Sequence, residues 1–587
     1  MRLKRTYKCG EITSKMVGQK VTVCGWVNSW RDLGGLLFID LRDRYGKVQA
    51  VFSPEKADIY QIASKLRSEY VAAISGTVQR RPEKDINREL ATGEIEIAAE
   101  DVELLNASKT PPFEIKEHIE VSEDLRLKYR YLDLRRTELQ QSLILRHNLA
   151  QITREFFNRE GFLEIETPML TKSTPEGARD FLVPSRLKPG KFYALPQSPQ
   201  TYKQILMVAG FDRYYQIVRC FRDEDLRKDR QPEFTQVDVE MSFVGEEEVL
   251  SVVEQYVKYL FKRALDIELQ IPFRRITYRE SMDRFGSDKA DTRFGLELND
   301  LTEAFRNTEF KVFRGVVEQN GYIGALAVPE AFDYSRKQLD ELTQWVTSME
   351  ASGLAHLKFS GGNFEGGIAK FLGEGEKEHL NRRLALSSQA LILIIADKKK
   401  AFAQTILGFL RNKLAADLRL IDPQAHHLHW TLDFPLLDYS EEEKKYVAMH
   451  HPFTSPKLED LHLLESEPEK ARARAYDLVY NGNELAGGSI RIHNRDLQER
   501  VFSALQLTRE EAEMKFGFLM EAFEYGAPPH GGIAFGFDRL VMLLGQVQSL
   551  RDVIAFPKTA RALGLMEQTP SDVSADQLRE LGIRLID

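Results

Sequence analysis

The sequence is poor in cysteine and contains no long apolar run. The three cysteines among 587 residues, Cys9, Cys24 and Cys220, are too few and too scattered for a disulfide framework or a thiolate zinc site. The longest apolar run, Leu391 to Ala396, is far shorter than the ~20 residues that a membrane helix needs. The basic start of the chain is not followed by the apolar segment of a secretory signal. We therefore expect a cytoplasmic globular protein without a membrane segment.

The chain also lacks an excess of positive charge. The 81 Lys and Arg residues against 89 Asp and Glu residues give a net charge of −8, which excludes a uniformly basic nucleic-acid coat. The first fifty residues differ, with ten Lys and Arg against four Asp and Glu. A local basic face near the start of the chain is therefore compatible with selective binding of a nucleic acid.

The first 105 or so residues have the pattern of a small β-barrel. Three strands, a helix and two more strands follow one another, which is the order of the OB-fold, a barrel that often holds single-stranded nucleic acid. Any other five-stranded barrel is the alternative. We expect strands over 21–30, 36–43, 47–52, 70–80 and 93–105 and a helix over 54–70. Basic and aromatic residues on the first strands favour the nucleic-acid interpretation: Trp26, Trp30, Arg31, Phe38, Arg42 and Arg44.

A charged connector and a larger, mixed region follow the barrel. Leu145, Leu149, Ile152 and Phe156 recur at the spacing of one helix face that ends near Gly161, and a strand is expected from there to Pro168. Helical patterns over 298–307, 335–349 and 400–418 predict an insertion with its own core, and the glycine-rich segment 360–367 is interpreted as a surface loop because it fits no nucleotide fingerprint. The predicted domains are 1–106, 107–140 (connector), 141–285, 286–424 (insertion), 425–560 and 561–587 (C-terminal extension).

Two segments carry the chemistry. In FRDEDLRKDRQPEFTQVDVEMSF, from Phe221, an arginine ends a strand and a later strand places Asp238 and Glu240 on one face, where the carboxylates need a partner. In PPHGGIAFGFDRLVMLL, a glycine-rich strand leads into a helix that begins with Asp538 and Arg539, a corner that suits a phosphate. Taken singly, a salt-bridged hairpin and a tight packing corner are the alternatives.

Together the two segments resemble motifs 2 and 3 of class II aminoacyl-tRNA synthetases, and the helix followed by GFLEIETPML resembles motif 1. TPEGARDFLVPSR, LPQSPQTYKQ, HHPFTSP and NGNELAGGSIRIH narrow the resemblance to the bacterial type of aspartyl-tRNA synthetase, over essentially the whole chain. Sequences of the HIGH and KMSKS type, a Walker A loop and a kinase signature are absent. The resemblance implies an α+β multidomain protein with an N-terminal OB-fold anticodon-binding barrel, an antiparallel catalytic sheet flanked by helices, and an inserted α/β domain.

The resemblance also implies a two-step reaction. L-Aspartate attacks the α-phosphate of ATP to give aspartyl-adenylate and pyrophosphate, and the aspartyl group then passes to the 3′-terminal adenosine of tRNA-Asp. Mg²⁺ and a homodimer formed through motif 1 are implied as well. A relaxed enzyme that charges both tRNA-Asp and tRNA-Asn is the alternative. Further rivals are asparaginyl- or lysyl-tRNA synthetase and a non-catalytic RNA-binding relative, which should have lost Arg222, Glu484 or Arg539.

The family motifs assign the nucleotide site. Arg222, Arg539 and Glu484 are the expected catalytic residues, and Phe234 is expected to stack on adenine. Asp477 and Glu484 resemble the carboxylates that hold magnesium, which prefers oxygen ligands. The full set expected at ATP is Arg222, Asp223, Glu224, Gln231, Phe234, Glu484, Gly536, Phe537, Asp538 and Arg539.

The amino-acid pocket needs positive charge for a side-chain carboxylate. Arg491 supplies it in fork geometry, and Lys203, kept in place by Asp238, is the expected second cation. Asparagine would leave these cations unpaired, at a cost of ~2–5 kcal/mol. Arg222 is expected to reach the α-carboxylate of the substrate. The other residues expected at aspartate are Glu176, Ser198, Gln200 and His450.

In the barrel, Phe38 and Gln49 match positions where the family stacks on and reads anticodon bases. Arg31, Arg81 and Glu96 match others nearby, and ordinary barrel packing is the alternative for each residue. Trp30 lies in a stretch that is usually more basic in the family. This departure weakens the case for backbone contacts by the first strand.

Overall fold

The computed structural model describes residues 1–586 apart from 175–177, 225–229, 387–388 and 442. The chain divides into two compact units, one of residues 1–145 with 551–571 and the other of residues 146–550 with 572–587. Each helix in the described part of the chain is too short or too polar to cross a lipid bilayer.

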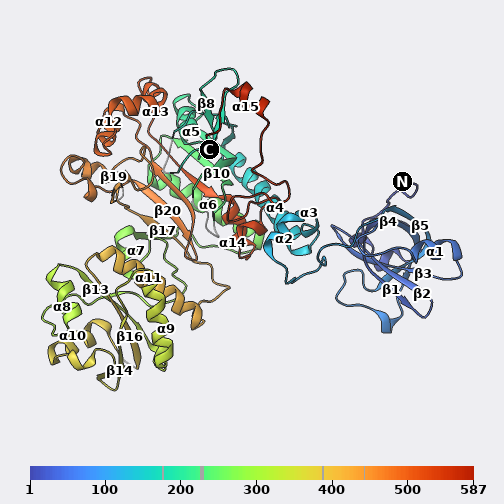
Figure 1. Ribbon diagram of the computed structural model, residues 1–587, viewed down its shortest axis with the longest axis horizontal. Coiled ribbons are helices and arrows are strands. Elements are labelled where there is room, and N and C mark those ends of the chain that lie inside the picture. Colours follow the sequence, from blue (N-terminus) through green and yellow to red (C-terminus); the bar gives the residue numbers. More distant parts are fainter. Residues whose placement is uncertain (175–177, 225–229, 387–388, 442, 587) are drawn as a thin grey trace. The chain divides into compact units, whose positions relative to one another are not determined.

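The first unit contains a closed five-stranded barrel, with strands in the order β1-β2-β3-β5-β4 (Figure 1). Most neighbours pair antiparallel, and a short parallel pairing between β3 and β5 closes the barrel. Inward-facing aliphatic side chains such as Val23, Ile39 and Ile97 are fully buried. The predicted order of three strands, a helix and two strands is confirmed. The elements are β1 (Lys20–Leu33), β2 (Leu36–Asp43), β3 (Gly46–Phe52), α1 (Ala57–Ala63), β4 (Val71–Arg80) and β5 (Ile95–Asn106).

Several basic and aromatic residues of the first strands stabilise the barrel itself. The buried Arg42 guanidinium donates to both carboxylate oxygens of Glu69, at 2.9 and 3.0 Å. The Trp30 indole N–H donates to the Ala63 carbonyl at 3.3 Å, and Trp26 lies 5.0 Å beneath the Arg135 guanidinium. Trp26, Trp30 and Arg42 thus have structural contacts within the unit, and their predicted part in a nucleic-acid face stays a prediction.

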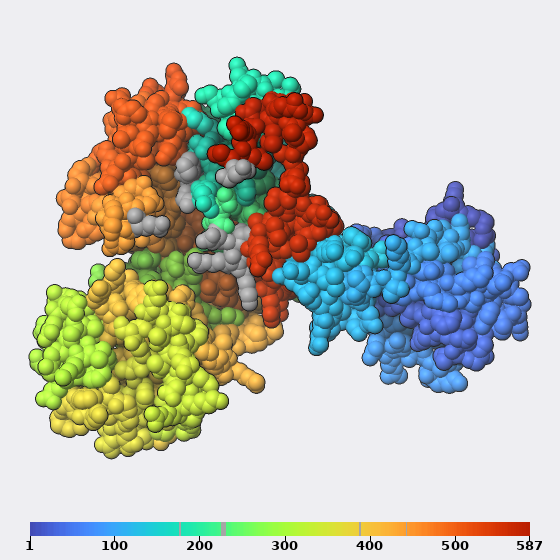
Figure 2. Space-filling view, viewed as in Figure 1, coloured from blue at the N-terminus to red at the C-terminus, as the bar shows by residue number. Residues whose placement is uncertain are grey.

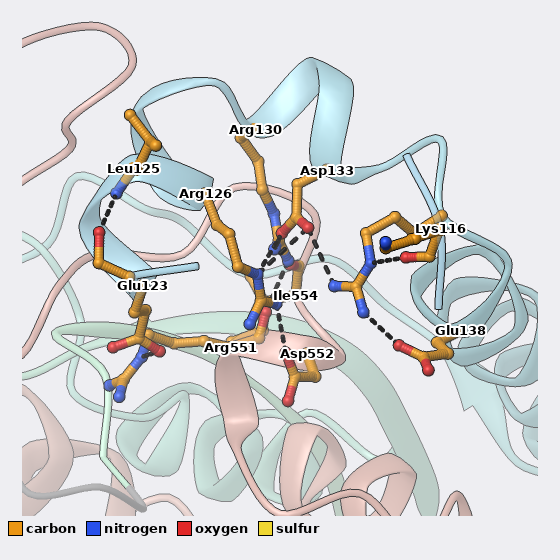
Figure 3. A network of polar contacts seen from close by, with 12 residues as sticks. Lys116, Glu123, Leu125, Arg126, Arg130, Asp133, Glu138, Arg551, Asp552 and Ile554 are labelled. Carbon is orange, nitrogen blue, oxygen red and sulfur yellow. Dashed lines mark hydrogen bonds and ion pairs between the residues drawn. The ribbon is translucent and has the colours of Figure 1, made fainter. Parts of the chain in front are cut away.

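The connector after the barrel is organised around one buried carboxylate. Asp133 is fully buried and accepts hydrogen bonds from Arg126, Arg130 and Arg136 (Figure 3). Arg130 also donates to the carbonyls of Arg551 and Ile554, at 2.6 and 2.9 Å. These bonds fasten the start of the 551–571 segment to the connector helices, which are α2 (Glu123–Lys128) and α3 (Arg130–Asp133).

The second unit is built on an eight-stranded sheet in the order β11-β17-β20-β21-β22-β10-β9-β6. The inner strands pair antiparallel, whereas the two edge pairs, β11 with β17 and β6 with β9, are parallel. The strands are β6 (Leu163–Glu164), β9 (Arg213–Phe221), β10 (Glu233–Ser242), β11 (Arg274–Thr277), β17 (Leu428–Leu432), β20 (Ala475–Tyr480), β21 (Asn483–Ile490) and β22 (His530–Gly536).

Helices pack on this sheet through aromatic side chains. Phe157 stacks on Tyr215 of β9 at 5.1 Å, and Tyr256 packs edge-on against Phe535 of β22 at 5.2 Å. Leu149 and Phe156 are buried, in agreement with the predicted helix face. The helices are α4 (Thr137–Arg159), α5 (Gln200–Val208), α6 (Glu246–Leu265), α7 (Tyr278–Phe285), α12 (Arg495–Ala504), α13 (Arg509–Phe523), α14 (Phe537–Leu544) and α15 (Ala575–Leu581), and two hairpins are β7 (Leu182–Pro184) with β8 (Phe192–Ala194) and β18 (Leu437–Ser440) with β19 (Lys445–Ala448).

The strand expected up to Pro168 is much shorter than predicted. Only β6 pairs with the sheet, and the last backbone bond on this side runs from Ile165 to the Tyr215 carbonyl. The segment lies at the edge of the sheet, and Pro168 has no N–H to continue a ladder. The chain therefore leaves the sheet early.

The predicted insertion contains its own five-stranded sheet, in the order β12-β13-β16-β14-β15, with paired strands antiparallel and apolar cores on the sheet. It forms a rounded lobe, green to yellow in Figure 2. The elements are β12 (Asn299–Asp300), α8 (Lys311–Glu318), β13 (Tyr322–Val328), α9 (Arg336–Thr347), β14 (Ala355–Ser360), β15 (Asn363–Glu365), α10 (Glu374–Leu384), β16 (Ala390–Asp397) and α11 (Lys400–Asp417).

Two of the three predicted helices of the insertion are confirmed as α9 and α11. The third, over 298–307, is wrong. The Leu301 N–H donates to the Ile323 carbonyl and the Thr302 N–H to the Asp300 carboxylate, so cross-strand pairing and a turn replace the helix. The glycine-rich segment 360–367 forms the β14–β15 hairpin, where Gly361 and Gly362 take positive φ angles of 57° and 85°.

Candidate active site and nucleic-acid interface

Two cavities of about 360 and 320 Å³ lie against the central strands of the large sheet. They have Arg222, Glu224, Gln236, Glu484 and Ala534 in common as lining residues. These shared walls make them two halves of one site. The first half collects residues predicted to bind aspartate, and the second half collects residues predicted to bind ATP.

Two buried cations that line the first cavity pair with two buried carboxylates. Lys203 of α5 is 1% exposed, and its Nζ lies 2.9 Å from Asp238 Oδ1 and 3.3 Å from Glu240 Oε2. Arg491 holds Glu240 with its Nε at 3.0 Å and donates to Ser489 Oγ at 2.7 Å. Asp238 and Glu240 lie on the same face of β10 because side chains alternate along a strand. Their predicted need for partners is met by this pair of cations.

The electrostatics of the two carboxylates differ. Burial raises the pKa of Asp238, and its Oδ2 has no hydrogen-bond partner among the described residues. Burial alone would also raise the pKa of Glu240, but Arg491 and Lys203 outweigh it and leave the pKa lowered. Asp238 and Glu240 therefore offset the charges of the two cations, and a ligand carboxylate can accept from the N–H groups of Lys203 and Arg491 that these bonds do not use.

His450 lies at the other wall of this cavity. Its Nε2 is 3.5 Å from Asp477 Oδ1, and its ring packs edge-on against Phe434 at 4.5 Å. Burial by itself would lower the pKa of His450, but the Asp477 carboxylate outweighs it and raises the pKa. Ser198 and Gln200 also line the cavity, whereas Glu176 lies outside the described residues.

Arg222 lies where the two cavities meet. Its guanidinium carbon is 5.0 Å from the centre of the Phe234 ring, and its buried Nε has no hydrogen-bond partner among the described residues. Such an unpaired donor is costly unless a ligand completes it. Arg539 also lines the second cavity and donates to the Glu484 carbonyl at 2.9 Å.

The remaining residues predicted at ATP divide into two groups. Glu224, Gln231, Phe234, Gly536 and Asp538 line the second cavity. The carboxylate of Asp538 accepts from the Thr235 N–H at 2.8 Å and pairs with Arg146, so it supports the wall of the cavity.

Asp223 and Phe537 do not appear among the described lining residues of either cavity. The Asp223 N–H donates to the Arg179 carbonyl at 3.0 Å, and Phe537 is buried, with the Arg146 guanidinium 5.0 Å from its ring. The contact of these two residues with ATP therefore stays a prediction.

The two carboxylates predicted to hold magnesium converge beside Gly487. A Cβ at this glycine would lie 2.8 Å from Asp477 Oδ1 and 3.5 Å from Glu484 Oε1. The other oxygen of Glu484, Oε2, lies 2.6 Å from Lys289 Nζ. No group of three or more His, Cys, Asp or Glu side chains in the described part of the chain is placed to hold a metal ion by itself.

The barrel has a cavity of about 690 Å³ on its outer face, and all five residues predicted to bind the anticodon line it. Arg31 donates to Gln49 at 3.2 Å, and Gln49 donates to Glu96 at 2.8 Å. Arg81 donates through Nε to the Ile95 carbonyl at 2.9 Å, while one terminal nitrogen has no hydrogen-bond partner among the described residues. The half-buried Phe38 ring completes a surface that offers stacking, donors and acceptors.

Sequence reasoning left one residue of the active site without a role and missed another. Alternation along the strand placed Glu240 beside Asp238, but Glu240 was not assigned to the aspartate pocket, although it holds both buried cations. Lys289 lines the second cavity from a segment outside the three family motifs, and no local pattern indicated it.

Comparison with known proteins agrees with this geometry. The family model described as "tRNA synthetases class II (D, K and N)" matches residues 122–560, and the one described as "OB-fold nucleic acid binding domain" matches residues 21–105. A relative from Caldanaerobacter subterraneus subsp. tengcongensis, named aspartate–tRNA(Asp/Asn) ligase, is 56% identical over 99% of this chain and 98% of its own length. A Staphylococcus carnosus relative, named aspartate–tRNA ligase, is 54% identical over 99% of both chains.

A solved structure shares the fold at low identity. The asparaginyl-tRNA synthetase of Pyrococcus horikoshii, complexed with asparaginyl-adenylate, matches with a TM-score of 0.59 and 18% identity, over 95% of this chain and 99% of that one. The chain belongs to the class II aminoacyl-tRNA synthetases, in the family of aspartate–tRNA ligases.

Proposed function

We propose that this chain activates L-aspartate with ATP to aspartyl-adenylate and then transfers the aspartyl group to the 3′-terminal adenosine of tRNA-Asp. The observation that carries the proposal is the buried pair of cations, Lys203 and Arg491, in a cavity that shares Arg222 with the nucleotide cavity. A substrate side-chain carboxylate can accept further charge-assisted hydrogen bonds from Lys203 and Arg491, whereas a neutral amide accepts weaker ones and a lysine side chain is repelled. We place this activity in the cytoplasm because its substrates, ATP and tRNA, occur there.

The geometry supports a proposed role for the residues on each side of the junction. An oxygen of the α-carboxylate of aspartate attacks the α-phosphorus, the bond to the bridging oxygen breaks, and pyrophosphate leaves with the electron pair. Arg222, between the two cavities, stabilises the charge that builds on the α-phosphate oxygens. Arg539 binds the distal phosphates, and Phe234 stacks on adenine. Fixing both substrates in adjoining cavities removes much of the entropic cost of their encounter.

Asp477 and Glu484 fit a magnesium ion that binds together with ATP. Their oxygens converge on the space that a Cβ at Gly487 would fill. Mg²⁺ is usually held by one or two carboxylates plus substrate phosphates and water, which agrees with a pair of carboxylates rather than a complete protein cage. When bound, the ion would neutralise charge on the triphosphate.

Aspartate-dependent exchange of labelled pyrophosphate into ATP tests the proposal. We expect exchange with L-aspartate and little with asparagine or lysine; equal exchange with all three, or none with any, would contradict it. A relaxed enzyme is the second candidate, because relatives of similar identity are named aspartate–tRNA(Asp/Asn) ligase or aspartate–tRNA ligase. Parallel charging of purified tRNA-Asp and tRNA-Asn separates the two candidates.

Phe38→Ala is expected to impair tRNA charging while leaving adenylate formation unchanged. Loss of one base stack, worth ~1–3 kcal/mol, should lower kcat/KM for tRNA about 5- to 150-fold. Charging and pyrophosphate exchange are measured on the same preparation. Tyr45→Ala is the control, since Tyr45 is an exposed barrel aromatic outside the described cavity lining. Equal losses in both reactions would refute the anticodon role of Phe38.

We also propose a homodimer formed through the motif 1 region. Large apolar side chains are exposed around the edge strand β6 and in the segments after it, which supports burial against a second copy. Sedimentation equilibrium should give twice the chain mass of 67.4 kDa. Leu163→Asp should favour the monomer, and Val312→Asp, an exposed site on α8, should not. A wild-type monomer at micromolar concentration would contradict the proposal. The exposed residues are Leu163, Leu170, Leu182, Leu187, Phe192, Tyr193, Phe211 and Phe243.

A further inference from the structure

Lys289 lies in the nucleotide cavity although it belongs to none of the three family motifs. Among the described residues that line the second cavity, Lys289 is the only lysine. Arg222, Phe234 and Arg539 line the same cavity. Its Nζ forms a 2.6 Å ion pair with Glu484 Oε2, and its side chain is 38% exposed. Burial alone would lower the pKa of Lys289, but Glu484 outweighs it and raises the pKa, so the ammonium is charged at neutral pH.

The backbone that carries Lys289 is fixed on both sides. On the sheet side, the Thr431 hydroxyl of β17 donates to the Asp288 carbonyl at 2.8 Å. On the insertion side, Arg411 of α11 donates to the Asp291 carbonyl at 2.8 Å. The neighbouring Ala290 is buried. Only the flexible side chain of Lys289 can therefore change partner without moving the sheet or the insertion.

Arg411 is itself held tightly. Its guanidinium carbon lies 5.0 Å from the Phe285 ring and 4.0 Å from the Phe294 ring, and it donates to the carbonyls of Phe294, Gly295 and Leu296 as well. An arginine so enclosed acts as a fixed anchor. The start of the insertion thus has a defined position beside the nucleotide cavity.

Charge balance implies that the Lys289–Glu484 pair is a resting arrangement. A divalent cation bound to Glu484 would bring two positive charges beside the single charge of the Lys289 ammonium on the same carboxylate. The cation would therefore repel the ammonium. The triphosphate of ATP brings a larger negative charge into the same cavity. The ammonium then has a better partner within reach of its four-carbon stem.

We propose that Lys289 is a phosphate-binding residue of the adenylation step, which pairs with Glu484 in the free enzyme and transfers to the β- and γ-phosphate oxygens when Mg·ATP binds. This inference rests on the proposed function and extends it, because it gives the insertion a share in the active site. Lys289 keeps its proton throughout. It stabilises pyrophosphate as the bond between the α-phosphorus and the bridging oxygen breaks.

Lys289→Met tests the exchange of partners with two readouts. Mn²⁺ binding to the enzyme without ATP is followed by electron paramagnetic resonance, and pyrophosphate exchange gives kcat and KM for ATP. Without the competing ammonium, Mn²⁺ should bind about tenfold more tightly, and kcat/KM for ATP should fall about 10- to 100-fold, the size of a lost charged hydrogen bond. Lys289→Arg should recover part of the lost kcat/KM for ATP in pyrophosphate exchange.

Lys413→Met is the matched control, since Lys413 on α11 is 32% exposed and forms a single 2.9 Å ion pair with Asp417. It should change neither readout, and thermal unfolding checks that every variant is folded. Unchanged kinetics for ATP in Lys289→Met would overturn the inference whether or not Mn²⁺ binding changes, as would weaker Mn²⁺ binding. Wild-type exchange that does not depend on aspartate would instead refute the proposed function.

Discussion

Arg491→Leu is expected to abolish aspartate activation while ATP binding stays measurable. The leucine removes the fork that reads the substrate carboxylate and leaves Glu240 with Lys203 as its remaining charged partner. Truncating one partner of a buried, hydrogen-bonded charge pair at a binding site costs about 2–5 kcal/mol of binding free energy, so aspartate-dependent exchange should fall by roughly 10³-fold. Exchange kinetics with varied aspartate, and calorimetric titration with ATP, measure the two effects separately.

The same substitution leaves a buried charge, so a second variant separates function from folding. Arg491→Leu combined with Glu240→Gln removes the buried carboxylate that has lost its arginine partner, and the double variant should be more stable than the single variant and still inactive. Arg474→Leu is the control, because Arg474 pairs with Glu246 outside the described cavity lining. Retained aspartate activation in either Arg491 variant would show that another group reads the carboxylate.

Arg222→Gln is expected to lower pyrophosphate exchange by about 10²- to 10³-fold, as for loss of one preorganised group at a developing oxyanion. Its buried Nε has no hydrogen-bond partner among the described residues, and its ring contact is with Phe234. The free energy of unfolding should therefore change by less than about 1 kcal/mol. Single-turnover adenylate formation and denaturant unfolding measure the two quantities.

Arg219→Gln provides the comparison on strand β9, which ends at Phe221 directly before Arg222, since Arg219 pairs with Glu233 and lies outside the described cavity lining. Exchange should stay within a factor of about two of wild type, as for a surface ion pair of little net energy. A similar loss in both variants would mean that strand β9 itself was disturbed. A fully active Arg222→Gln enzyme would remove Arg222 from the reaction.

Local periodicity predicted the secondary structure correctly where contacts within a single helix or strand determine it. The barrel order, the face of α4 and the helices α9 and α11 follow from alternation or from a 3.6-residue period. Ser574 caps α15, a local pattern of the same kind, by accepting from the Gln577 N–H. Two predictions are wrong, the long strand before Pro168 and the helix over 298–307. At both places the local structure is determined by a sheet edge or by pairing with a neighbouring strand.

The sequence by itself determined the family, the strand and helix order of the barrel, and a set of charged residues that must meet partners. Only the tertiary structure decided which partners they meet. Asp238 and Glu240 share one face of a strand by alternation, but their pairing with Lys203 and Arg491 depends on strands and a helix that are distant in the chain. Arg42 and Arg31 look alike in sequence, yet one is buried on Glu69 and the other lines a cavity. Lys289 reaches Glu484 only because the insertion is anchored beside the sheet. Burial and long-range contact, which set the energy of a charge, are properties of the folded chain.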